Sequence, residues 1–172
     1  FSQSSSKPSN SPDIKTIEYE LSYPGKIMPD HPLWFLKAGR DRVWHTLSLN
    51  QSKKAELSVL FSDKRLIMSK TLFEKEKPDL GFSTLTKAEK YLEKALKEEE
   101  KARAEGMDTS SLLIKIATAS LKHREIINSI LEIAPEDAKP EIIVLEGKVM
   151  DSYKKAVDVL NSKGIEGPVN PF

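Results

Sequence analysis

Apolar residues recur at steps of three and four through most of the chain, and this is the spacing of one buried helix face. The pattern is interrupted by short polar stretches that contain proline, glycine or asparagine. It predicts five helices, at about residues 32–47, 52–77, 83–105 and 109–133, and from a start in or just after the segment 135–140 to about residue 161.

Residues that start and stop helices separate these stretches. Pro32 suits the first position of a helix, where its missing N–H costs nothing, and either Asn50 or Ser52 suits the cap of the second. We expect Pro78–Gly81 to end the second helix. Gly106 and Gly164 are typical stops for the third and last helices.

Each predicted helix has one apolar face that we expect to lie in the core. On the first helix this face consists of Leu33, Leu36, Val43 and Leu47. Short connections between long helices favour antiparallel neighbours. The predicted fold is therefore all-α: an antiparallel bundle of about five helices with extended N- and C-terminal tails. The last four helices form an up-down bundle, and the first packs across one end or side.

The N-terminal part has a different pattern. Ile17, Tyr19 and Leu21 alternate with Glu18 and Glu20, which predicts an extended segment with one apolar face. It is either an arm that lies along a helix pair or a plain leader, because a lone strand has no sheet to join. We divide the chain into a Ser- and Pro-rich leader and arm (1–22), a helical bundle domain (23–163) and an extended tail (164–172).

The composition of the chain limits the classes of partner and the cellular compartments that are expected. Lys and Arg number 27 against 26 Asp and Glu, so no overall charge favours nucleic acid. The chain has no cysteine and no apolar run long enough to span a bilayer. Residues 1–13 have the composition of a spacer that follows a cleaved signal peptide or anchor. We expect an extracytoplasmic protein (secreted, periplasmic or at the cell surface), with membrane proximity through a removed signal or anchor.

No motif in the sequence indicates catalysis. The chain has no phosphate-binding loop, no nucleophile elbow and no histidine pair with metal-ligand spacing. The acidic run Glu98–Glu100 is interpreted as a solvated helix face. His123 lies on an apolar helix face in line with Ser120 and Ile127, which favours a hydrogen-bonded core histidine. We expect no enzyme activity, no cofactor and no metal.

Aromatic and basic residues gather on the first predicted helix. The aromatic residues are either a core anchor, which we favour, or a partner-binding surface. The basic residues either pair with Glu56 or Asp63 to set the helix register or form a site for an acidic partner. The candidate partner-binding residues are Trp34, Phe35, Lys37, Arg40, Arg42 and Trp44.

Two blocks of sequence resemble a known family. The first comprises Pro24-Gly25, Pro29, Pro32-Leu33-Trp34 and Lys37; the second comprises Lys53-Lys54-Ala55-Glu56-Leu57 and Asp63-Lys64-Arg65-Leu66. Together they resemble the bacterial and archaeal DUF5667 family, with the specific part at about Pro24 to Leu66. The resemblance implies an exported or surface-associated helical domain without an assigned activity, and it brings no catalytic residues.

Two functions remain after these exclusions. The leading hypothesis is a non-enzymatic extracytoplasmic module that binds another protein or serves as an accessory subunit of an envelope or surface assembly. Its contact surface would be the tails and the first-helix region. The alternative is an envelope ligand- or stress-sensing domain, which requires a small pocket near His123.

Overall fold

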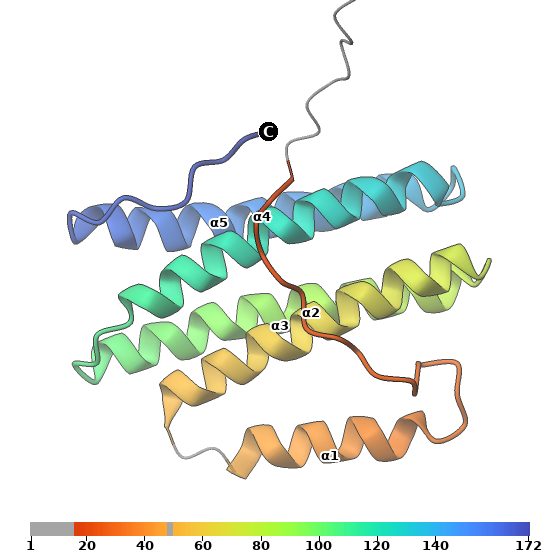
Figure 1. Ribbon diagram of the computed structural model, residues 1–172, viewed down its shortest axis with the longest axis horizontal. Coiled ribbons are helices and arrows are strands. Elements are labelled where there is room, and N and C mark those ends of the chain that lie inside the picture. Colours follow the sequence, from red (N-terminus) through yellow and green to blue (C-terminus); the bar gives the residue numbers. More distant parts are fainter. Residues whose placement is uncertain (1–15, 48–49) are drawn as a thin grey trace, which may run out of the picture.

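Helices make up most of the described chain (Figure 1). The computed structural model describes residues 16–47 and 50–172, apart from the side chains of residues 44–46. No strand occurs within these ranges, so the predicted all-α class is confirmed. The helices are α1 (Trp34–Leu47), α2 (Gln51–Glu74), α3 (Pro78–Ala104), α4 (Ser110–Ile133) and α5 (Lys139–Ser162).

Two antiparallel hairpins stack to make the bundle. Helices α2 and α3 form one hairpin and α4 and α5 the other, and α2 packs on α4 while α3 packs on α5. Helix α1 lies outside this group and, among the helices, packs only on α2. The predicted four-helix bundle with a peripheral first helix is therefore confirmed. Its core contains the fully buried side chains Leu66, Leu85, Leu92, Leu113, Ile116, Ile127, Ile130, Ile142 and Leu160.

The turn between α2 and α3 corrects one predicted boundary. Pro78 does not end the second helix but begins the third, since proline is suited to a first helical turn. Glu76 takes the left-handed conformation that the tight turn needs, with φ of 57°. Gly81 consequently lies within α3, where an added Cβ would come within 2.8 Å of the Phe73 ring. This close approach explains a glycine inside a helix.

The apolar face predicted for α1 is not buried. Leu33, Leu36, Val43 and Leu47 are between 48% and 70% exposed. Periodicity finds the apolar stripe of a helix but cannot tell whether the bundle has a groove to receive it. Here α1 turns another side toward α2, and Asp41 is the buried one among the α1 residues whose side chains the structure describes.

The arm crosses the bundle as an extended segment. The Ile17 backbone N–H donates to Glu125 Oε2 at 2.8 Å, and the Tyr19 hydroxyl donates to Asp63 Oδ2 at 2.7 Å. Tyr19 and Leu21 also pack against the core. These contacts support the interpretation of residues 16–21 as an arm that lies on a helix pair, across α2 and α4 (Figure 1).

The C-terminal tail folds back on the α4–α5 hairpin. The Tyr153 hydroxyl donates to the Pro168 carbonyl at 2.6 Å, and the guanidinium of Arg124 lies 5.0 Å from the centre of the Phe172 ring. The arm and the tail thus contact consecutive residues of α4, Glu125 and Arg124. Among the described helices, none combines the length and the apolar character needed to cross a membrane.

Candidate functional site

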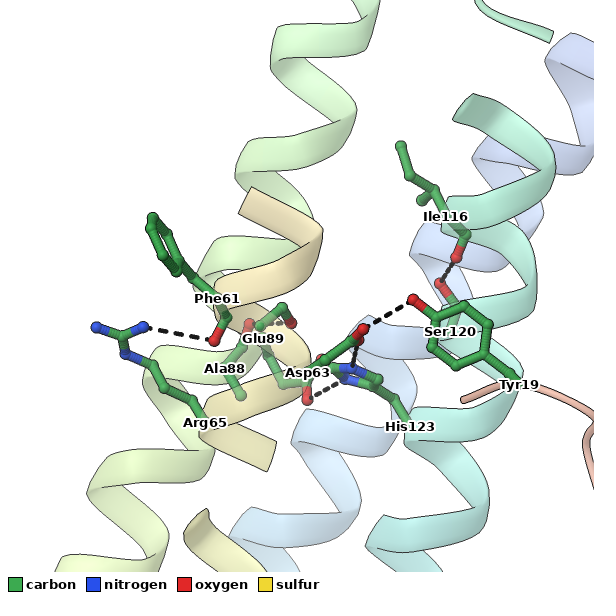
Figure 2. A network of polar contacts seen from close by, with 10 residues as sticks. Tyr19, Phe61, Asp63, Arg65, Ala88, Glu89, Ile116, Ser120 and His123 are labelled. Atoms are coloured by element: carbon green, nitrogen blue, oxygen red, sulfur yellow. Dashed lines mark hydrogen bonds and ion pairs between the residues drawn. The ribbon is translucent and has the colours of Figure 1, made fainter. Parts of the chain in front are cut away.

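A buried polar network joins the arm to three helices (Figure 2). His123 of α4 has no exposed surface. Its Nε2 lies 3.1 Å from Asp63 Oδ1 of α2, and its Nδ1 lies 3.1 Å from Glu89 Oε1 of α3. The other oxygen of Asp63 accepts the hydrogen bond from Tyr19. The prediction of a hydrogen-bonded core histidine is confirmed.

The two carboxylates set the protonation of this histidine. Burial alone would lower the pKa of His123, but the charges and hydrogen bonds of Glu89 and Asp63 outweigh it and raise the pKa from 6.5 to about 9. At neutral pH the ring is therefore an imidazolium that donates from both nitrogens. Burial and the neighbouring Asp63 carboxylate raise the pKa of Tyr19, which keeps its phenol protonated and able to donate.

This geometry suits a structural clamp and not a reactive site. Both nitrogens of His123 face carboxylates on opposite sides of the ring, so no lone pair is left for a metal ion. Within residues 16–47 and 50–172, no group of three or more His, Asp or Glu is placed to hold one. Because His123 has no exposed surface, the network does not provide the pocket that the sensing alternative requires.

The acidic run on α3 corrects another expectation. Glu98 and Glu99 are buried, and only Glu100 is a solvated residue. Ser58 donates to Glu98 at 2.7 Å, and Thr109 donates to Glu99 at 2.5 Å. The hydroxyl donors lie 40 and 10 residues away in sequence, so only the packed bundle brings them to the carboxylates.

The predicted aromatic residues have different environments. Trp34 is half-buried, with its ring centre 5.5 Å from Lys37 Nζ and 5.9 Å from the Arg65 guanidinium. Phe35 is 66% exposed, so the expectation of a core anchor is wrong for this residue. The side chain of Trp44 lies outside the described residues.

Arg40 does not form the predicted pair with Glu56 or Asp63. Arg40 forms an ion pair with its neighbour Asp41 at 3.0 Å, whereas Asp63 is engaged by His123 and Tyr19. Lys37 donates to the backbone carbonyls of Pro24 and Ile27, which ties residues 23–33 (the entry segment) to α1. Arg42 is exposed.

A surface cleft of about 480 Å³ opens where the entry segment meets α1. Its walls combine apolar and basic side chains. The lining residues are Tyr23, Pro24, Gly25, Lys26, Ile27, Leu33, Leu36, Lys37, Arg40 and Lys64. Lys26 and Lys64 are not among the candidates predicted from the sequence, because they lie on different segments that only the fold brings together.

The comparisons with known proteins place the chain in one family. Residues 26–137 match the model of DUF5667, which is described as a domain of unknown function, and this is more than half of the chain. The chain belongs to the DUF5667 family. The resemblance predicted from two sequence blocks is thus confirmed.

The DUF5667 region holds most of the features described above. It includes helices α1 to α4, the three residues of the His123 network and the basic residues of the cleft, while Tyr19 and α5 lie outside it. A search of curated proteins and a search of solved structures each found no match.

Proposed function

We propose that this DUF5667 protein is a non-enzymatic, extracytoplasmic helical module that binds another protein and serves as an accessory or structural subunit. The binding surface is the outer apolar face of α1, formed by Leu33, Phe35, Leu36, Val43 and Leu47. The exposure of these five large side chains is the observation that carries the proposal.

The energetics of this face favour a partner. A helix of a soluble protein normally turns its apolar residues to the core, but α1 leaves these side chains in water. Burying one large aliphatic or aromatic side chain contributes about 1.5 to 3 kcal/mol. These side chains are 48% to 70% exposed, so a partner that covered the face would gain about half of this figure for each, which helps to offset the free-energy cost of association.

The position of α1 also suits a contact surface. The arm and the C-terminal tail both lie on α4, whereas α1 packs only on α2 among the helices. A tether attached through the arm would approach the bundle at α4 and leave the α1 face accessible. The expected location outside the cytoplasm rests on the Ser-rich composition of residues 1–13 and on the family resemblance.

A pair of matched variants tests the proposal. Phe35→Ser/Val43→Ser removes two side chains of the α1 face, and Ile143→Ser/Val144→Ser removes two similarly exposed side chains of α5. Both should leave the free energy of unfolding within about 0.5 kcal/mol of the unchanged protein per substitution. Quantitative affinity purification from the native source should recover a partner with the unchanged protein and the α5 variant, but at least tenfold less of it with the α1 variant.

Equal recovery with both variants would contradict the role of α1. A turnover activity of the purified protein that survives removal of all bound partners would contradict the non-enzymatic assignment.

A further inference from the structure

The cleft beside α1 has an unbalanced charge. Four of its lining residues, Lys26, Lys37, Arg40 and Lys64, are basic, and none of the described residues that line it is acidic. This differs from the chain as a whole, in which basic and acidic residues are nearly equal in number. The imbalance is therefore local to the place where the entry segment, α1 and α2 meet.

Among the described residues, one ion pair, between Arg40 and Asp41, neutralises a cation of the cleft, and Lys26, Lys37 and Lys64 form none. Asp41 is buried and already paired with Arg40. Arg65, under the Trp34 ring, adds a further charge, and its buried Nε has no hydrogen-bond partner. Burial lowers the pKa of Lys37, and the negative charge of Asp41 partly opposes this shift. The positive charges of Lys64, Arg40 and Arg65 lower the pKa of Lys37 further. The cleft thus lies in a positive field.

Apolar side chains complete the site. Leu33 and Leu36 line the cleft and also belong to the exposed face of α1. The Lys37 ammonium holds the carbonyls of Pro24 and Ile27, so the wall opposite α1 is fixed before anything binds. A ligand that fits must offer carboxylates and an apolar side chain together, because either feature alone would leave half of the cleft unmatched.

We propose that this cleft binds an acidic peptide segment of the partner protein, with an apolar side chain against Leu33 and Leu36 and carboxylates facing Lys26, Lys64 and Arg40. This inference rests on the proposed function and names the chemistry of its ligand. A peptide suits a concave site with a fixed wall better than a flat bilayer surface does.

The test measures direct binding with a defined probe. The probe is a fluorescein-labelled peptide, Glu-Glu-Leu-Phe-Glu-Glu, followed by fluorescence anisotropy with the full chain. Lys26→Glu/Lys64→Glu should weaken binding at least tenfold, and Leu36→Ser should weaken it several-fold. The matched control is Lys87→Glu/Lys90→Glu, which changes two exposed lysines of α3 and should bind as the unchanged protein does. Binding should also weaken as salt rises, because exposed charges are screened.

Four outcomes would overturn the inference. In the first, the acidic peptide does not bind; in the second, a peptide with Gln in place of every Glu binds equally well. In the third, the α3 control variant loses as much peptide affinity as Lys26→Glu/Lys64→Glu does. In the fourth, the protein binds phosphatidylglycerol vesicles but not the peptide. If the peptide fails while the Phe35→Ser/Val43→Ser variant still loses its partner, this inference falls and the proposed function stands. If the peptide binds but partner recovery does not depend on α1, the proposed function falls instead.

Discussion

The buried histidine offers the sharpest prediction about stability. His123→Gln replaces a buried cation with a neutral amide between Asp63 and Glu89, which lie 3.1 Å from its two ring nitrogens. Removing one partner of a buried ion pair typically costs about 3 to 5 kcal/mol, because a charge is left without compensation. A native domain is stable by only about 5 to 15 kcal/mol. We therefore expect a large fall in the free energy of unfolding.

The pH dependence gives this prediction a second, independent signature. The pKa of His123 rises from 6.5 to about 9 on folding, which corresponds to about 3 kcal/mol. Since the folded-state pKa is the higher one, this stabilisation is fully present below about pH 6.5 and is lost as the pH rises through about 9. The variant lacks the titrating group, so its difference from the unchanged protein should shrink as the pH rises through this window.

Urea unfolding followed by circular dichroism measures both effects, at about pH 6 and about pH 9.5. The exposed His31 provides the matched control, because His31→Gln should change the free energy of unfolding by no more than about 0.5 kcal/mol. A loss below about 1 kcal/mol for His123→Gln at the lower pH would refute the reasoning. So would a pH dependence that is the same in the variant and the unchanged protein.

Two further predictions concern the arm and the helix packing. Tyr19→Phe removes the hydroxyl that donates to Asp63 and should cost about 1.5 to 3 kcal/mol in urea unfolding, with faster proteolysis of the arm; unchanged proteolysis would contradict the docked arm. Gly81→Ala should lower the free energy of unfolding by about 1 to 3 kcal/mol, because the added Cβ would clash with Phe73. Gly147 lies at an exposed helix position with open space around it, so Gly147→Ala should raise the free energy of unfolding by about 0.5 to 1 kcal/mol. Thermal melts of both variants measure these changes, and shifts of the same sign would contradict the packing described for α3.

Hydrophobic periodicity was sufficient to predict the bundle because α2 to α5 bury the apolar stripes that the sequence shows. Its failures have physical causes. Pro78 is compatible with either ending one helix or starting the next, and the choice depends on Glu76 accepting a left-handed conformation. The sequence predicts that the apolar face of α1 is buried, because it does not show whether the bundle has a groove in which this helix could pack.

The polar site was predictable only in part. The position of His123 on an apolar face was enough to infer a buried histidine with polar partners. Its actual partners are 34 and 60 residues away, and no local spacing connects them. The basic cleft likewise draws on three separate segments, so Lys26 and Lys64 became candidates only once the fold had placed them beside Arg40.

Site-specific photo-cross-linking in the native source tests the central claim most directly. A photoreactive residue is placed singly at Phe35, Val43 or Leu47 on the outer face of α1, and at Ile143 or Val144 on α5 as controls. We predict that the α1 positions cross-link to one common protein and that the α5 positions do not cross-link to it. The account would be contradicted if no α1 position captured a protein, or if the same protein were captured equally well from α5.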